Sequence, residues 1–337
     1  MLFPTLHSFI RRSIAGVAAA SSVALMATPS SVHSQPNPAF PGKTVTLVVP
    51  FTPGSGSDVI ARIIAPKLSA RWKQSVIVDN KPGASGNLGG SFVAKAAPDG
   101  HTLLVTADSF TMAPAIYKNM PYDPAKDFAP VAQLAETSYA FAVNPAVPAK
   151  DLKSLVAYVK QNPGKVNYAS PGNGTPHHLA MEMFKTKTGL DILHVPYKGI
   201  SGALTDLMGG QVQLMIGSVN SLVPYATSGK LRLLAVTGAA RSPVVPDVAT
   251  FREQDMESVD GGNAYYLVLA PAHTPLELVA RLNSDISSEM NASDVRAELL
   301  KLGITVRTGL PVQLGTSLQK DLSRWRKVVA DAGITAD

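Results

Sequence analysis

Residues 44–70 read TVTLVVPFTPGSGSDVIARIIAPKLSA, and the fold class follows from this stretch. Residues 44–49 form an apolar run that ends at a proline, which is typical of a buried strand. A glycine-rich turn follows, and apolar side chains then recur at helical spacing over residues 58–70. A buried strand that leads through a short turn into a helix is the first half of a β-α-β unit, whose strands run parallel.

Strand and helix patterns alternate along the rest of the chain. A strand at 75–78, a helix at 88–96 and a strand at 102–106 complete a βαβαβ series, which predicts a parallel sheet with helices on both faces. A second series follows residues 139–144, with helices at 152–161, 176–188 and 201–208 and strands at 166–169, 193–195, 213–216 and 231–236. The last predicted elements are a strand at 265–270 and helices at 276–290 and 312–332.

The two series predict an α/β protein of two lobes, each a mainly parallel sheet flanked by helices. A chain of 337 residues is long enough to bury two cores. No disordered linker separates the series, so we expect short crossings near residues 139–144 and 260–265. The first lobe is predicted to hold residues 35–141 and 264–337, and the second lobe to hold residues 142–263.

Residues 1–34 have the pattern of a signal peptide. Arg11 and Arg12 precede an uncharged apolar run that is too short to span a bilayer. We predict export by the general secretory route and cleavage after Ser34, with Gln35 as the first residue of the mature chain. The protein is then expected to be periplasmic.

The composition sets limits on stability, anchoring and partners. The chain has no cysteine, so we expect neither disulfides nor a lipid anchor at a lipobox. No later apolar run reaches the roughly 20 residues that cross a bilayer. The formal charge of +6 is compatible with an anionic ligand but is too small and too dispersed for a nucleic-acid partner. We predict a soluble monomer.

A five-residue pattern occurs once in each series, between a predicted strand and a predicted helix. The two copies read Pro53-Gly54-Ser55-Gly56-Ser57 and Pro171-Gly172-Asn173-Gly174-Thr175. Glycine lets backbone N–H groups approach a ligand, and Ser or Thr can cap the following helix. Helix N-termini attract anions through unpaired N–H groups and the macrodipole. Two such turns across a cleft would bind a carboxylate, although each is also compatible with a plain connection between elements.

Two enzyme classes are weighed against a binding protein. A dinucleotide-binding fingerprint would require a third glycine where the chain has Val59. A secreted hydrolase of small carboxylic esters is the main alternative, but residues 83–87 read GASGN and lack the last glycine of a nucleophile elbow. His177 and His178 are adjacent and cannot form an i, i+4 metal pair. We therefore predict no catalytic residues, no metal site and no cofactor.

The ordered set of motifs resembles the Bug, or TctC-like, family of extracytoplasmic solute-binding proteins. The matching segments are VVPFTPG at 48–54, DNKPGASGN at 79–87, APDGHTL at 97–103, YASPGNGT at 168–175, HVPYKG at 194–199 and GGQV at 209–212. The resemblance implies a periplasmic binding protein fold with a ligand cleft between the lobes, closure on the ligand, and no catalysis. It also implies that the protein delivers a small carboxylate to the membrane subunits of a tripartite tricarboxylate transporter.

The family's binding loops assign ligand contacts to this chain. In the first lobe they are Phe51, Thr52, Gly54, Ser55, Gly56, Ser57 and Asp58, and in the second Ser170, Asn173, Gly174, Thr175 and His178. The carboxyl edges of the predicted strands add Ala107, Asp108, Ser109 and Ser218, and Tyr197 is expected to flank the ligand.

Three of these assignments have alternatives. Asp58 fits either a structural role at a helix start or an ion pair with a ligand ammonium group. Phe51 fits the core as well as a pocket wall, and His178 fits the surface as well as a hydrogen bond. Dicarboxylates, tricarboxylates, acidic amino acids and aromatic acids all agree with this sequence.

Overall fold

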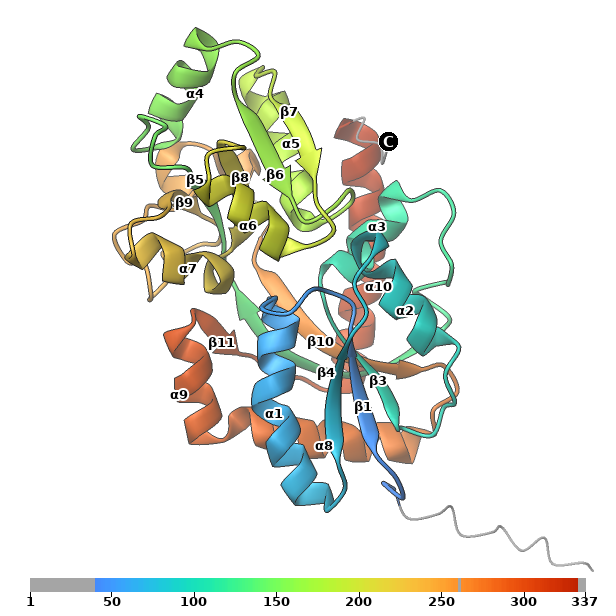
Figure 1. Ribbon diagram of the computed structural model, residues 1–337. Helices are drawn as coiled ribbons and strands as arrows, with labels where there is room; N and C mark the ends of the chain where they lie inside the picture. Colours follow the sequence, from blue (N-terminus) through green and yellow to red (C-terminus); the bar gives the residue numbers. More distant parts are fainter. Residues whose placement is uncertain (1–39, 260–261, 333–337) are drawn as a thin grey trace, which may run out of the picture. The chain divides into compact units, whose positions relative to one another are not determined.

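The computed structural model describes residues 40–259 and 262–332, which form two β-sheets with helices on their faces (Figure 1). The predicted signal peptide, its cleavage after Ser34 and the new terminus at Gln35 lie outside the described residues. Among the described residues, none of the helices combines the length and the apolar character that crossing a membrane requires.

The first sheet has the strand order β11-β4-β10-β3-β1-β2. β1 is parallel to β2 and β3, whereas β10 is antiparallel to β3 and β4, and β11 is antiparallel to β4. The six strands are β1 (Val45–Val49), β2 (Val76–Asn80), β3 (Thr102–Ala107), β4 (Phe128–Thr137), β10 (Ala264–Pro271) and β11 (Ile304–Val306).

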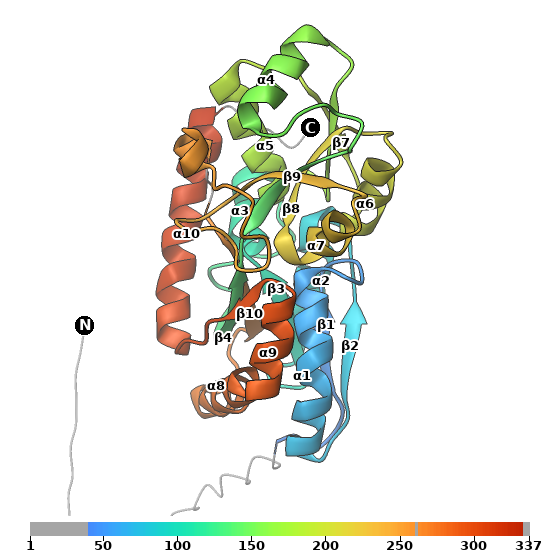
Figure 2. The ribbon, with the colours of Figure 1, turned by 90° about the vertical axis from the view of Figure 1, so that its left-hand side faces the viewer.

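Strand alternation divides the core of this sheet between its two faces. On β1, Leu47 and Val49 point to one face, and Val48 points to the other. The first face is covered by α1 (Gly56–Trp72), α8 (Leu276–Asn291) and α9 (Ser293–Lys301), and the second by α2 (Asn87–Ala94), α3 (Ser109–Ile116) and α10 (Pro311–Ala332) (Figure 2). A short 3₁₀ turn, η1 (Ala84–Gly86), precedes α2.

The second sheet has the order β7-β6-β8-β5-β9, and only β5 runs against its neighbours. Its strands are β5 (Tyr139–Val143), β6 (Asn167–Ser170), β7 (Leu193–Pro196), β8 (Leu214–Ser218) and β9 (Arg232–Val236). α4 (Leu152–Gln161) and α5 (Pro176–Thr188) pack on one face, and α6 (Ile200–Met208) and α7 (Val219–Thr227) pack on the other. Two 3₁₀ turns, η2 (Arg252–Gln254) and η3 (Glu257–Val259), follow β9.

The chain leaves the first sheet at the end of β4 and returns to it at the start of β10, and these two strands are neighbours. β4 ends at Thr137 and β5 starts at Tyr139, while the return path enters the first sheet at Ala264. We call the first sheet with its helices the first lobe, and the second sheet with α4 to α7 the second lobe. Helix α10 also reaches the second lobe, because Trp325 packs in one cluster with Leu179 of α5.

The predicted fold class is confirmed, and every strand and helix named from the sequence is present within a few residues. One difference concerns residues 139–143, predicted as a crossing, which form β5 between β8 and β9 inside the second sheet. Five elements were not predicted. α3 and α7 carry an internal proline, β4 carries Pro130, and α9 and β11 are short.

Candidate functional site

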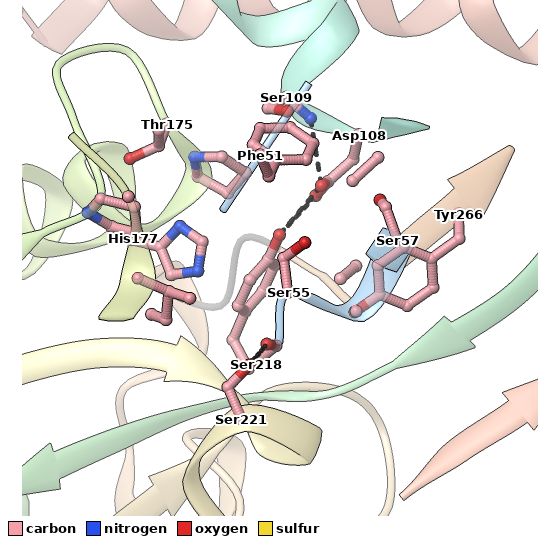
Figure 3. A pocket seen from close by; sticks show the side chains of 18 residues that line it. Phe51, Ser55, Ser57, Asp108, Ser109, Thr175, His177, Ser218, Ser221 and Tyr266 are labelled. Atoms are coloured by element: carbon pink, nitrogen blue, oxygen red, sulfur yellow. Dashed lines mark hydrogen bonds between the residues drawn. The ribbon is translucent and has the colours of Figure 1, made fainter. Parts of the chain in front are cut away.

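A cavity lies where the carboxyl ends of the central strands from both lobes meet (Figure 3). Its volume is about 70 Å³, several times the ~10–15 Å³ that one water needs. We call it the inner cavity. The first turns of five helices line it, through Ser57 of α1, Ser109 of α3, His177 of α5, Ile200 of α6 and Ser221 of α7.

The helix N-termini determine the electrostatic character of the inner cavity. Each N-terminus carries a partial positive charge on its unpaired N–H groups. No Lys or Arg is among the described residues that line the cavity. The arrangement therefore suits a small anion that is bound by backbone and hydroxyl groups rather than by an ion pair.

Asp58 organises the turn before α1 without lining the cavity. Its carboxylate accepts hydrogen bonds from the Gly54 amide at 2.9 Å, from Arg62 Nε at 3.0 Å and from Asn80 Nδ2 at 2.9 Å. Burial alone would raise the pKa of Asp58, but the hydrogen bonds from Arg62, Gly54 and Asn80 outweigh burial and lower it. The amide of Gly54 is thus already used by the protein, and the contacts of Asp58 agree with the structural one of its two expected roles.

Two stacked histidine rings support the second glycine turn. His178 Nδ1 accepts a hydrogen bond from the Gly174 amide at 3.2 Å, and its ring stacks on His194 with centroids 4.4 Å apart. His194 Nε2 lies 2.7 Å from Ser170 Oγ. Burial lowers the pKa of His178, and it lowers that of His194 to about 4, so both imidazoles are neutral at pH 7. His178 and Ser170 position the turn instead of lining the cavity.

Three buried polar atoms around the inner cavity have no hydrogen-bond partner among the described residues. They are Ser57 Oγ, Ser109 Oγ and His177 Nδ1. Ser57 and Ser109 are 1% and 3% exposed, respectively, and burial lowers the pKa of His177 to about 3, which keeps the ring neutral. Buried polar groups are nearly always paired, so three unpaired atoms around one cavity suit a ligand that carries hydrogen-bonding groups.

A neighbouring cavity of about 240 Å³ shares Phe51, Pro171, Thr175 and Gly199 with the inner one. We call it the outer cavity. It is lined by residues of both lobes, among them Asn173, Tyr197 and Lys198.

The lobes touch beside the outer cavity. The backbone oxygen of Asn173 accepts hydrogen bonds from Ser85 Oγ and, at 3.1 Å, from Tyr117 Oη. A Cβ atom at Gly199 would lie 2.5 Å from Thr52 Cγ2, and one at Gly174 would lie 3.2 Å from Tyr117. Glycines of the second lobe therefore allow the two lobes to approach closely.

The predicted ligand-binding residues fall into three groups. The inner cavity is lined by Phe51, Ser55, Gly56, Ser57, Ala107, Asp108, Ser109, Thr175 and Ser218. Asn173 and Tyr197 line the outer cavity. Outside both cavities, in the supporting turns or at the contact between lobes, lie Thr52, Gly54, Asp58, Ser170, Gly174 and His178.

Several residues that line the inner cavity were not predicted. They are Tyr139, Pro171, Pro176, His177, Gly199, Ile200, Ser221, Ala264 and Tyr266. Pro171 belongs to the repeated turn, and Pro176 and His177 open the helix that follows it, so these three could have been found from the pattern. Tyr139 and Tyr266 occur in apolar strand runs that look like ordinary core.

The described part of the chain contains no group of three or more His, Cys, Asp or Glu side chains that could hold a metal ion. The inner cavity contains neutral hydroxyls, neutral imidazole and one carboxyl group, that of Asp108. Its polar groups can bind and orient a ligand.

Comparisons with known proteins agree with this description. The profile of a family described as "Tripartite tricarboxylate transporter family receptor" (TctC) matches residues 60–334. A curated relative from Pseudomonas sp. (strain P51), a UPF0065 protein in the tcbD-tcbE intergenic region, is 38% identical over 97% of this chain and 96% of its own length.

Two similar solved structures contain a ligand. MatC from Rhodopseudomonas palustris, with bound malate, is 36% identical with a TM-score of 0.82, over 86% of this chain and 100% of that chain. An R. palustris protein with adipate is 35% identical with a TM-score of 0.83, over 88% of this chain and 99% of that chain.

Proposed function

Since the chain belongs to the TctC family of tripartite tricarboxylate transporter receptors, we propose that it binds a small carboxylate in the inner cavity and delivers it to membrane transport subunits. The family is one of periplasmic binding proteins and not of enzymes. We further propose that the signal pattern of residues 1–34 directs export, and that the mature protein is a monomer without a lipid anchor.

The observation that carries the proposal is the set of unpaired atoms Ser57 Oγ, Ser109 Oγ and His177 Nδ1 around one cavity. Hydroxyl groups can donate hydrogen bonds to a carboxylate, and five helix N-termini surround the same space. A carboxylate there would satisfy groups that the protein leaves without partners. Because such groups recognise only the carboxylate, they leave the rest of the ligand to the outer cavity.

The outer cavity supports a ligand that extends beyond the inner cavity. It adjoins the inner cavity through Phe51 and Thr175, and the exposed Lys198 is among the residues that line it. Two relatives have been solved with the dicarboxylates malate and adipate. We propose a dicarboxylate as the first class to test, with one carboxylate in the inner cavity.

The test uses the unpaired hydroxyls, because removing them has opposite effects on stability and binding. Ser57→Ala and Ser109→Ala should leave the unfolding temperature of the ligand-free protein unchanged or slightly raised, since a buried unpaired group costs about 1–3 kcal/mol. Each should weaken binding of malate or adipate by about tenfold, the effect of one lost hydrogen bond to a charged group. Calorimetric titration measures the affinity, and thermal unfolding measures the stability.

Ser69→Ala is the matched control. Ser69 Oγ donates to the Gln74 carbonyl at 2.7 Å, away from both cavities, so this variant should lose about 1 kcal/mol of stability and keep its affinity. In a thermal-shift screen of carboxylates, a ligand at 100 times its Kd adds about 2.7 kcal/mol. No shift with any carboxylate would refute the proposed function.

A further inference from the structure

Among the described residues that line the inner cavity, Asp108 provides the only carboxyl group. It follows β3 directly, and its side chain caps the start of α3, where Oδ1 accepts a hydrogen bond from the Ser109 amide at 3.1 Å. Oδ1 and Oδ2 also accept from Tyr139 Oη at 2.9 and 3.0 Å. Figure 3 shows Asp108 beside Ser109 in the inner cavity. The residue is 2% exposed, so an acid is buried in a cavity that otherwise suits an anion.

The groups that face Asp108 do not compensate a negative charge. Tyr139 on β5 and Tyr266 on β10 are neutral phenols, and His177 on α5 is a neutral imidazole that lines the same cavity. Tyr265 on β10 donates to Asp321 of α10 at 2.6 Å, and that carboxylate adds negative charge nearby. Burial, the largest cause, raises the pKa of Asp108 to about 7, and Asp321 adds to the rise, whereas Tyr139 and the Ser109 amide oppose it.

A carboxylate ligand in the inner cavity would bring a second negative charge close to Asp108. Two carboxylates that share a desolvated site cannot both stay ionised, so the pKa of one of them rises strongly. The ligand's carboxylate would lie among five helix N-termini, which favour its ionised form. Asp108 is therefore the group that gains the proton.

We propose that Asp108 determines ligand specificity by its protonation: it takes one proton from solvent when a carboxylate binds, and the resulting carboxylic acid donates a hydrogen bond to the ligand. This inference rests on the proposed function and assigns the chemistry of the same site. Tyr139 and the Ser109 amide can continue to donate to Oδ1 while Oδ2 carries the proton. A site of this kind selects a ligand that places a hydrogen-bond acceptor beside Asp108.

An ammonium ligand fits this position less well. An ammonium group has three N–H donors that need acceptors, whereas Asp108 already accepts from Tyr139 and Ser109 and keeps fewer than three of its roughly four lone-pair positions free. Within residues 40–259 and 262–332, no second carboxyl group lines the inner cavity to complete such a site. The geometry thus favours an acceptor on the ligand over a cation.

The test is the pH dependence of affinity, measured by calorimetric titration of the mature protein with malate and with adipate. Ligand carboxyl groups ionise near pH 4, so they stay charged between about pH 6 and pH 9. We expect constant affinity below about pH 7 and a roughly tenfold loss for each pH unit above it, because one proton must then be taken up for each ligand. Paired buffers with different ionisation heats should show uptake of about one proton per ligand at pH 8.5.

Three variants distinguish the effect of Asp108 on the pH dependence of affinity from the effects of its neighbours. Asp108→Asn should bind with the same affinity at pH 6 and pH 9, because it has no proton to gain. Tyr139→Phe should move the midpoint to higher pH, since it removes a hydrogen bond that favours the ionised carboxylate. Asp321→Asn, outside the cavity, should keep the slope and move the midpoint to lower pH.

Each outcome decides the inference. A pH-independent wild type, or an Asp108→Asn variant that keeps the wild-type slope, would overturn it while leaving carboxylate binding intact. Affinity that rises with pH would mean that ionised Asp108 pairs with a cation, and it would also overturn the inference. If no carboxylate binds the wild type at any pH, the proposed function fails and this inference fails with it.

Discussion

Gly56 is the residue at which the first glycine turn comes closest to other atoms of the site. A Cβ atom there would lie 2.0 Å from Tyr266 Oη, and the same oxygen donates to Asn220 of α7 at 3.2 Å. Any side chain at Gly56 must therefore displace a phenol that lines the inner cavity. Position 56 requires glycine because a side chain there would overlap Tyr266. This role differs from that of Gly54, whose amide donates to Asp58.

We expect Gly56→Ala to weaken carboxylate binding by about five- to 150-fold, the equivalent of about 1–3 kcal/mol for an overpacked site. Titration calorimetry with malate or adipate measures the loss. Gly209→Ala is the control, because Gly209 has φ −76° at the end of α6 and its nearest neighbour to a Cβ is 3.4 Å away. Wild-type affinity in Gly56→Ala would show that the ring of Tyr266 moves without consequence.

At the scale of residues, the sequence predicted the site residues at strand ends better than it predicted the side chains that reach the inner cavity from other elements. Ser57 was assigned through the resemblance to the family's first binding loop, whereas Ser109 was predicted because it closes a strand at the carboxyl edge of the sheet, where local pattern determines position. The choice between His177 and His178 depends on the rotation of α5, and neighbouring helix positions differ by about 100°. Tyr139 reaches Asp108 through the pairing of distant segments, which no local pattern reports.

Among the elements, the first turn of α1 depends on a buried charge outside the cavity. Asp58→Asn keeps the size of the side chain but removes the charge that binds Arg62 and the Gly54 amide. We expect a loss of about 1–3 kcal/mol of stability and weaker ligand binding, because the turn that presents Ser57 loses its anchor. Denaturant unfolding and calorimetry measure the two effects.

Asp99→Asn serves as the comparison for that variant. Asp99 pairs with exposed Lys43 at 3.1 Å, and surface ion pairs contribute about 0–1 kcal/mol. This variant should therefore lose little stability and keep its affinity. Unchanged affinity in Asp58→Asn would show that the turn holds its shape without the carboxylate.

The predictability of an element followed the strength of its local pattern. α4 and α5 were predicted to the residue, because Asp151 and Thr175 cap them and their apolar faces recur at helical spacing. β4 was not predicted, since Pro130 and the irregular spacing of its polar residues weaken the strand pattern, and pairing with β10 overrides that weakness. The three residues of β11 are too few for any periodicity.

For the whole molecule, we expect an open form without ligand and a closed form with it, moving about the crossings beside β5 and β10. Groups from both lobes line the inner cavity, so a ligand that contacts both favours closure by its differential affinity. Small-angle scattering should show a smaller radius of gyration on addition of malate or adipate. An unchanged radius would indicate that the lobes are already together without ligand.

Gly199→Val tests whether close approach of the lobes is required. Its side chain would collide with Thr52 of the first lobe, 2.5 Å from the position of the Cβ atom. We expect weaker binding and no ligand-dependent change in radius, while Gly209→Ala should behave as the wild type. Normal closure in Gly199→Val would mean that Thr52 moves aside at little cost in free energy.

The pairing of β4 with β10 makes the second lobe an insertion within a single hairpin. Thr137, the last residue of β4, lies directly opposite Ala264, the first residue of β10, in an antiparallel pair. Opposed residues of such a pair have Cα atoms only about 4.5–5.5 Å apart, a gap that a two-residue turn such as Asn-Gly can close. The first lobe would then keep all six strands of its sheet. Relatives could exchange second lobes at this junction, recombining half-sites without rebuilding the first sheet.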